Sequence, residues 1–198
     1  AASDVYKRQD INLIKMCYEI VSLSRTKSIL IDLNDSFFIN NFLKSLKMPD
    51  RGKDELISLI NMKSLDEIRI FLKEANVSRR KYEEISELIS FDGPPTIIKK
   101  LKKFCDKYSY KATKNIKSIT NISNKLKILK GTAINIDLCS FNSMDYESGF
   151  NYSFYVDNLR KPIALGGRYD SYKHNDGSIR DATGFSIDLK DVITVYEK

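Results

Sequence analysis

The sequence predicts an α+β fold in which a helical region is followed by an antiparallel sheet. Apolar side chains recur at helical spacing through most of residues 10–130, whereas after Gly131 they alternate with polar ones, as in strands with one buried face. The chain has 198 residues, 42% of them hydrophobic, which is enough to bury the core of one ordinary domain. We therefore expect one domain over residues 10–198, with a helical insertion at about 36–130 and a sheet region at 131–198.

The first quarter of the chain predicts a helix, a strand and a second helix. Residues 1–9 carry no helical pattern, and we expect them to be an unstructured or remnant segment. A helical stripe of apolar residues runs through residues 10–23, and the apolar run 28–33 predicts a short strand. The polar residues at 34–36 can start the next helix, which we expect to end at Pro49.

Five further helices are expected before Gly131. Ser64 and Glu67 form the pattern of a capping box, in which the hydroxyl and the carboxylate accept hydrogen bonds from free N–H groups at a helix start. The expected helical segments are 55–60, 65–75, 82–89, 97–105 and 116–129. After Gly131, the expected strands are 133–138, 152–156, 162–165 and 183–187, and a last helix covers 189–196.

The net charge of +7 comes from one segment of the chain. Residues 1–94 carry 15 basic and 15 acidic groups, residues 95–130 carry 11 lysines and one aspartate, and residues 131–198 carry 7 basic and 10 acidic groups. No arginine and few aromatic residues lie among those lysines, so stacking on RNA bases has little support. The lysines favour a solvated face, and a docking surface for an acidic patch of a partner is the intermediate interpretation.

Residue patterns for a metal site or a cofactor are missing from the sequence. Cys17, Cys105 and Cys139 are far apart, and no Cys/His cluster occurs, so we expect no metal site, no disulfide framework and no cofactor. His174 has no partner at a catalytic spacing and is interpreted as a surface residue. The cysteine pattern favours a reducing, cytoplasmic compartment, and no apolar run is long enough to span a membrane.

Three ordered segments of the last third carry a family resemblance. Residues 144–149 read Met-Asp-Tyr-Glu-Ser-Gly, residues 164–170 read Ala-Leu-Gly-Gly-Arg-Tyr-Asp, and residues 182–189 read Ala-Thr-Gly-Phe-Ser-Ile-Asp-Leu. In order and spacing they resemble the Leu-Asp-Tyr-Tyr-Thr-Gly element, the Gly-Gly-Arg-Tyr-Asp element and the third class II motif of histidyl-tRNA synthetase-like domains. The resemblance implies that the chain is a C-terminal part of such a domain, with a helical region followed by part of a class II synthetase-like antiparallel sheet.

Departures from the family pattern imply that the aminoacylation chemistry has been lost. Where the synthetase has an arginine that acts on the substrate carboxylate and phosphate, this chain has Asn142. Aligned without gaps, the arginine of the third motif that grips the ATP phosphates is replaced by Asp191. An anion at this position would repel ATP, so no catalytic residue is expected.

One branch of the family fits this pattern: the histidyl-tRNA synthetase-like regulatory subunit of ATP phosphoribosyltransferase. The resemblance implies a non-catalytic subunit that a short catalytic subunit requires, in a hetero-oligomer, for the first step of histidine biosynthesis. Self-association is compatible with this role, and we expect no membrane partner and no nucleic-acid partner. Two alternatives stay open, namely a fragment of a true histidyl-tRNA synthetase and a basic RNA-binding module that rests on residues 95–130.

The resemblance also implies a ligand pocket. Tyr146 and Tyr169 match positions that line the amino-acid pocket of the synthetase, and here they could help to sense histidine. Arg168 and Asp170 alternate on a strand and are expected to form a structural ion pair, whereas Gly184 is expected to serve close packing. The full set of expected pocket residues is Tyr146, Gly149, Gly166, Gly167, Arg168, Tyr169 and Gly184.

Overall fold

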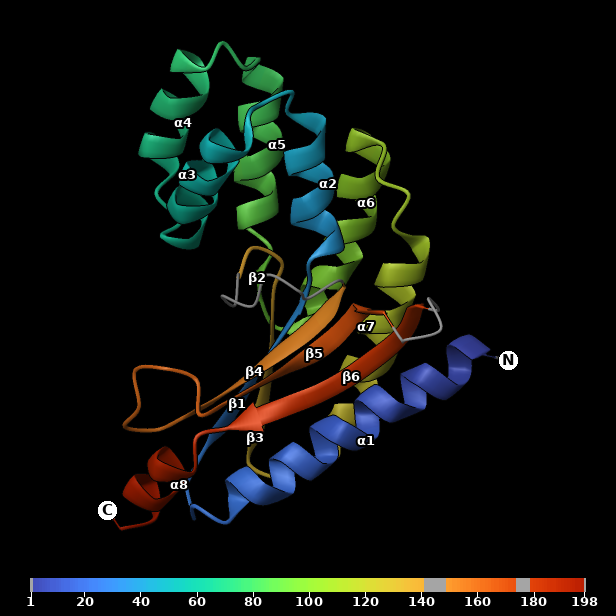
Figure 1. Ribbon diagram of the computed structural model, residues 1–198, viewed down its shortest axis with the longest axis vertical. Helices are drawn as coiled ribbons and strands as arrows, with labels where there is room; N and C mark the ends of the chain where they lie inside the picture. The colour runs from blue at the N-terminus through green and yellow to red at the C-terminus, as the bar shows by residue number, and fades with distance from the viewer. Residues whose placement is uncertain (1, 141–148, 174–178, 198) are drawn as a thin grey trace.

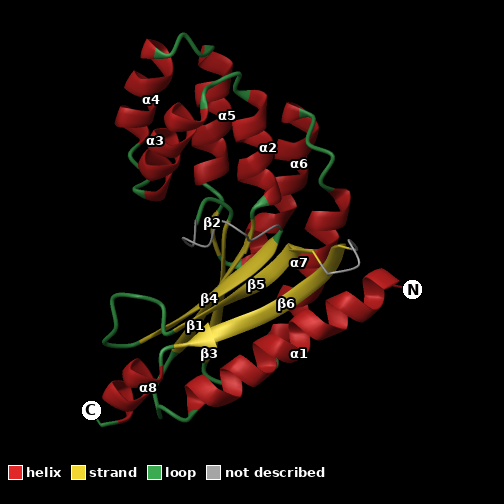
Figure 2. Ribbon diagram, in the orientation of Figure 1, coloured by secondary structure: helices red, strands yellow, loops and turns green. Residues whose placement is uncertain are grey.

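A computed structural model of the chain shows a twisted sheet with helices on one face and a lobe of helices at one end (Figures 1 and 2). It describes residues 2–140, 149–173 and 179–197, and the side chains of residues 9–140, 149–168 and 182–197. Among the described residues, no helix is both long and apolar enough to cross a membrane. The α+β class expected from the sequence is confirmed.

The first half of the described chain is mainly helical. Helix α1 is followed by strand β1, helices α2 to α5, the two-residue strand β2, a 3-10 turn η1, and helices α6 and α7. The bounds are α1 Ala2–Ser22, β1 Ile29–Asp35, α2 Phe37–Ser45, α3 Asp50–Asn61, α4 Leu65–Glu74, α5 Arg79–Ile89, β2 Asp92–Gly93, η1 Pro95–Ile97, α6 Ile98–Tyr108 and α7 Thr113–Leu126. The second half contains β3 Thr132–Asp137, β4 Phe150–Val156, β5 Ala164–Lys173, β6 Ile179–Ile187 and α8 Leu189–Tyr196.

The sheet is mixed and not purely antiparallel as expected. Its six described strands follow the order β2-β3-β1-β4-β5-β6, in which β1 and β3 pair in parallel and the other neighbours are antiparallel. A parallel pair needs a long connection that carries the chain back to the starting edge. The segment from α2 to α7 makes this connection, and helices α2 to α6 form the helical lobe at the end of the sheet (Figure 1).

Two local expectations are wrong. Residues 2–9 belong to α1, because a helix that is already held by buried Ile11, Ile14 and Cys17 extends easily over neighbouring residues of ordinary helix propensity. The capping box at Ser64 is not formed, since the Ser64 side chain makes no cap hydrogen bond. Its backbone N–H instead donates to Leu59 O in the turn that ends α3, where Lys63 has a φ of 52°.

Helices α1 and α7 cover one face of the sheet, which we call the covered face. Ile31 and Leu33 of β1 and Phe154 of β4 are fully buried there. Because side chains alternate along a strand, Asp32 and Asn34 lie on the opposite face. The apolar core therefore lies between the sheet and these two helices, and the opposite face is free to carry polar groups.

Candidate functional site

The two adjacent glycines of β5 face opposite sides of the sheet. Gly166 pairs with Tyr152 on the covered face, where an added Cβ would lie 2.5 Å from the Tyr152 hydroxyl oxygen and 2.7 Å from the Gly184 carbonyl oxygen. Gly167 pairs with Asn151 on the opposite face, where an added Cβ would lie 2.8 Å from the Asn151 Cβ. Gly166 therefore allows tight packing against Tyr152 on the covered face. Gly167 presents no side chain to the opposite face, where Asn151 lies directly beside it.

The opposite face carries a continuous set of polar groups, which we call the polar face. Asn34, Asn151, Gly167 and Gly184 occupy paired positions across β1, β4, β5 and β6. Within the described residues, the Oδ1 atoms of Asn34 and Asn151 are buried and accept no hydrogen bond. Buried amide oxygens usually have a donor, so this pair can accept hydrogen bonds from a ligand. The polar face is made of Asp32, Asn34, Asn135, Asp137, Asn151, Ser153, Gly167 and Gly184.

A charged cluster lies where the polar face meets the helical lobe. Lys63 Nζ lies 2.8 Å from Asp137 Oδ2 and also donates to Asp92. Asn135 Nδ2 donates to Asp92 Oδ1 at 2.8 Å and to Asp32 Oδ1 at 3.1 Å. Three carboxylates thus share one lysine and one amide, and they tie the turn between α3 and α4 to strands β1, β2 and β3.

The environment of this cluster shifts the pKa values of Asp32 and Asp92 in opposite directions. Burial, followed by repulsion from Asp137, raises the pKa of Asp32 from 3.8 to about 7. For Asp92, partial burial acts to raise the pKa, but hydrogen bonds from Lys63 and Asn135 lower it overall. Asp32 is therefore the carboxyl group of the polar face that can hold a proton near neutral pH.

A small pocket of about 350 Å³ lies at the end of β1, next to one expected site residue. Gly149, with a φ of 123°, donates its N–H to Ser36 Oγ at 2.8 Å, and its carbonyl oxygen accepts from the Ser36 N–H at 2.9 Å. A φ in this region is readily adopted only by glycine. The pocket is lined by Ser36, Phe37, Asn40, Asn41, Lys44, Asn115 and Gly149, so its wall is rich in amides.

Arg168 forms a structural ion pair, but with a partner that the sequence did not suggest. Its side chain extends from β5 on the covered face and donates to both carboxylate oxygens of Asp10, with Nε–Oδ2 and Nη2–Oδ2 distances of 2.9 and 2.5 Å. Asp10 belongs to α1 and is fully buried. The expected partner Asp170 has no described side chain. Arg168 thus fixes α1 on the sheet from the face that lies opposite the polar face.

Asp191 lies in the first turn of α8 and is held by a lysine. Lys161 Nζ lies 2.7 Å from Asp191 Oδ2 and 3.2 Å from Asp188 Oδ2. Asp188 also caps α8, because its carboxylate accepts from the backbone N–H groups of Lys190 and Asp191. The position at which the resemblance expects a phosphate-binding arginine is thus occupied by an anion in an ion pair.

The structure brings together only part of the expected site. Gly167 and Gly184 lie side by side on the polar face, Gly149 lines the small pocket, and Gly166 lies on the covered face. Asn142 and Tyr146 lie outside the described residues, as does the side chain of Tyr169, whose backbone pairs with Ala182. Sequence reasoning missed Asp32, Lys63, Asp92, Asn135 and Asp137. Polar residues at every second position of two strands were the available signal.

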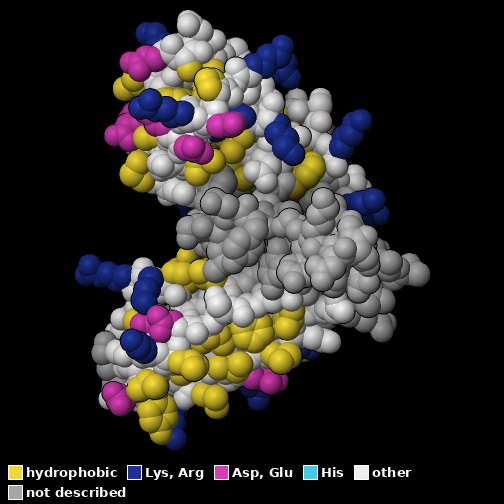
Figure 3. All heavy atoms as spheres, in the orientation of Figure 1, with side chains coloured by type: hydrophobic (Ala, Val, Ile, Leu, Met, Phe, Trp, Pro, Cys, Tyr) yellow, Lys and Arg dark blue, Asp and Glu magenta, His cyan; other side chains and the backbone are white. Residues whose placement is uncertain are grey.

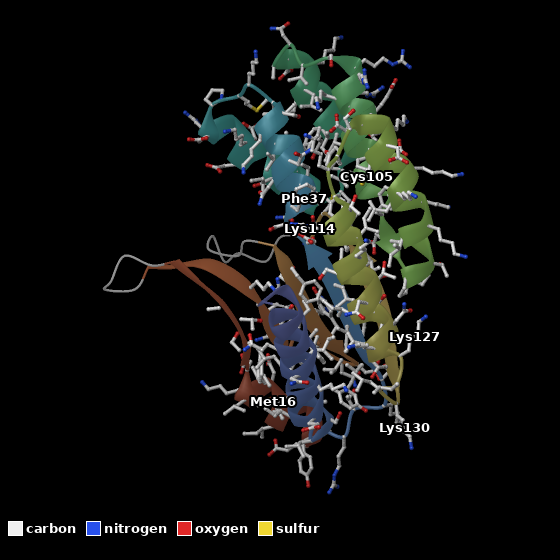
Figure 4. The ribbon with its side chains drawn as sticks, turned by 90° about the vertical axis from the view of Figure 1, so that its right-hand side faces the viewer. Met16, Phe37, Cys105, Lys114, Lys127 and Lys130 are labelled. Atoms are coloured by element: carbon white, nitrogen blue, oxygen red, sulfur yellow. The ribbon has the colours of Figure 1, made fainter. Side chains whose placement is uncertain are left out.

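The lysines of residues 95–130 do not join this site. All eleven are exposed, and within the described part of the chain only Lys107 has an acidic partner, Glu87, at 2.7 Å. Figure 4 shows Lys114, Lys127 and Lys130 along α7 and the loop after it. Among the described residues, the charged cluster included, no group of three or more His, Cys, Asp or Glu side chains is arranged to hold a metal ion.

Comparison with known proteins decides the family. A family model for histidyl-tRNA synthetase matches residues 4–192, which is nearly the whole chain. The chain belongs to the histidyl-tRNA synthetase family. This confirms the family that the resemblance predicts, and the match covers the helical region as well as the three segments after Gly131.

Within this family, the chain is similar to proteins named as regulatory subunits. It is 27% identical over 183 residues to the ATP phosphoribosyltransferase regulatory subunit of Polynucleobacter asymbioticus, a match that covers 91% of this chain and 46% of that protein. It is 27% identical over 175 residues to the protein of the same name from Clostridium botulinum, with 87% and 41% covered. The chain therefore spans about half the length of the curated relatives that it matches.

Two solved structures show the same fold. An ATP phosphoribosyltransferase regulatory subunit/histidyl-tRNA synthetase from Bacillus halodurans superposes with a TM-score of 0.78 at 20% identity, covering 96% of this chain and 50% of that chain. The ATP phosphoribosyl transferase (HisG:HisZ) complex from Thermotoga maritima contains a chain that superposes with a TM-score of 0.60 at 18% identity, with 81% and 53% covered. The class II synthetase-like architecture of the family is thus confirmed for this chain.

Proposed function

We propose that this chain is part of a non-catalytic regulatory subunit of ATP phosphoribosyltransferase. In this role it joins a short catalytic subunit in the cytoplasm for the first step of histidine biosynthesis. The observation that supports the proposal is Asp191, which stands where the family resemblance expects the ATP-binding arginine and which forms an ion pair with Lys161. A carboxylate at this position repels the ATP phosphates that aminoacylation requires. The names of the Polynucleobacter and Clostridium relatives support the same role.

We further propose that the polar face keeps an amino-acid pocket that responds to histidine. Gly167 presents no side chain to this face and pairs with Asn151 of β4 and Gly184 of β6, which places the backbone of β5 directly beside the Asn151 amide. The buried Oδ1 atoms of Asn34 and Asn151 can accept from the ammonium or imidazole N–H groups of an amino acid. Asp32 adds a carboxyl group whose charge a bound cation would favour. Tyr146 and Tyr169 complete the wall of this pocket in the proposal.

The test is a reconstitution assay with the full-length protein. It is mixed with a short-form ATP phosphoribosyltransferase catalytic subunit from the same source, and phosphoribosyl-ATP formation is followed. Activity that needs both chains supports the proposal. Inhibition by histidine that weakens in an Asn151→Leu variant, but not in a Lys99→Ala control, supports the pocket.

A true histidyl-tRNA synthetase is the alternative that the assay must separate, because the family model carries that name. The same preparation is therefore tested for charging of histidine onto tRNA. Charging by this protein alone, with no effect on the catalytic subunit, would contradict the proposal and would show that Asn142 and Asp191 do not prevent aminoacylation.

A further inference from the structure

A second pocket lies at the far end of the helical lobe, where α4 ends and α5 begins. Its volume is about 730 Å³, within the range of roughly 300–1,000 Å³ that small-molecule sites occupy. It is lined by Arg69, Leu72, Lys73, Asn76, Val77, Arg79 and Tyr82. None of these lining residues is acidic, and Figure 3 shows Lys or Arg side chains as well as Asp or Glu side chains on the surface of the lobe.

The backbone turn that shapes this pocket is well defined. Asn76 has a φ of 53°, which asparagine tolerates better than most residues. The N–H of Val77 donates to Leu72 O at 2.8 Å, and the N–H of Asn76 donates to Lys73 O at 3.0 Å, which together form a Schellman motif. This turn sets the half-buried Val77 beside Leu72, which is 1% exposed, so the pocket has an apolar floor.

The rim of the pocket is cationic. Residues 69–82 contain five basic residues and one acidic residue, Glu74, which is a local net charge of +4. Arg69 pairs with Asp66 at 3.1 Å and Arg79 with Glu83 at 3.1 Å, but both pairs are exposed. A bound anion can therefore replace each carboxylate as the partner of its arginine at little cost in free energy. Lys73 has no acidic partner within the described part of the chain. Three cations are thus available to one anionic ligand.

We propose that this pocket binds a phosphorylated ligand that carries a planar ring, of which a nucleoside phosphate is the simplest kind. Arg69 and Arg79 present planar guanidinium groups, which match phosphate oxygens in bidentate geometry, and Lys73 adds a point charge. The half-buried ring of Tyr82 offers an aromatic surface, and Leu72 offers an aliphatic one, for the planar part of the ligand. This site is separate from the polar face and does not depend on the function proposed above.

The test is titration calorimetry on the full chain without any partner, with ATP, adenosine and pyrophosphate as probes. ATP is expected to bind saturably. Adenosine and pyrophosphate are expected to bind at least about tenfold more weakly, because adenosine lacks the phosphates and pyrophosphate lacks the planar ring. Lys73→Ala, Arg79→Ala and Tyr82→Leu are each expected to weaken ATP binding about tenfold or more. Tyr82→Phe keeps the ring and is expected to bind like the unmodified chain.

The control is the double variant Lys99→Ala/Lys102→Ala, which removes two exposed charges of α6 outside the pocket. Circular dichroism checks that each variant is folded, and Lys73 and Arg79 are exposed, so their substitution leaves the core intact. Retained ATP binding in the control and its loss in the Arg79→Ala variant support the site. Absence of saturable ATP binding, equal weakening in the control, or pyrophosphate binding as tight as that of ATP would overturn the proposal.

Discussion

The ion pair between Arg168 and Asp10 offers the sharpest test of how this fold is held together. Asp10 is on α1, Arg168 is on β5, and 158 positions separate them in the chain. The Asp10 side chain is 1% exposed and that of Arg168 is 25% exposed. In an Arg168→Met variant the methionine keeps much of the volume, but the buried carboxylate loses the guanidinium that neutralises it.

The expected loss in unfolding free energy is about 3 kcal/mol. Breaking a buried pair by removing one partner costs roughly 3–5 kcal/mol, and the partial exposure of Arg168 places this pair near the lower end of that range. Removing both charges in an Asp10→Leu/Arg168→Met variant is expected to recover most of the lost stability, because the Asp10 carboxylate then no longer stays buried without its cation. The double variant therefore separates the cost of an isolated charge from the loss of packing.

The assay is urea unfolding followed by far-UV circular dichroism, with the slope of the transition checked for constancy between variants. Lys161→Met is the matched control, since it removes a cation from a more exposed pair and should destabilise the chain less than Arg168→Met does. The reasoning is refuted if Arg168→Met is no more destabilising than this control. It is also refuted if the double variant is as unstable as Arg168→Met alone.

Three further predictions concern the sheet and its link to the helical lobe. Gly166→Ala is expected to lower the unfolding free energy by roughly 1–3 kcal/mol, because the new methyl group overlaps the Tyr152 side chain. Asp32→Asn is expected to stabilise the chain relative to the unmodified one, by up to about 4 kcal/mol at pH 7 and above. The reason is that the pKa of Asp32 is raised from 3.8 to about 7 in the folded state, so the stability of the unmodified chain falls as pH rises through this window. Lys63→Met is expected to destabilise the chain by roughly 1–3 kcal/mol, because Asp92 and Asp137 lose their cation. The loss is expected to be larger at pH 8 than at pH 5, because Asp32, with a pKa of about 7, is ionised mainly at the higher pH and is then stabilised by the charge of Lys63.

Each of these predictions has its own measurement and contrary outcome. Thermal and urea unfolding measure the stability of the Gly166→Ala variant, and a stability equal to that of the unmodified chain would show that Tyr152 moves aside freely. Urea unfolding over a pH series reports Asp32→Asn, for which a benefit that is independent of pH would contradict a raised pKa in the folded state. For Lys63→Met, a loss of equal size at both pH values would mean that Lys63 does not stabilise the ionised form of Asp32.

Local patterns in the sequence predicted most elements of the fold. The apolar run at 28–33 became β1, and the apolar pattern at 189–196 became α8, because the spacing of apolar residues along neighbouring positions indicates the type of element. The parallel pairing of β1 with β3 was not predicted, since the two strands meet only after the helical lobe is in place. The helix over residues 2–9 was missed for a similar reason, because packing of the later turns of α1 holds it.

Some features of the candidate site were also determined by the sequence, and others only by the tertiary structure. The sequence by itself determined the family and the two glycines of β5, because each of these is a matter of residue type at a spacing along the chain. Only the tertiary structure decided that Gly166 and Gly167 face opposite sides of the sheet and that Arg168 pairs with Asp10. It also decided that Lys63 joins Asp92 and Asp137 beside Asp32, because groups separated by tens of residues meet only when the strands are paired and the helical lobe is docked on them.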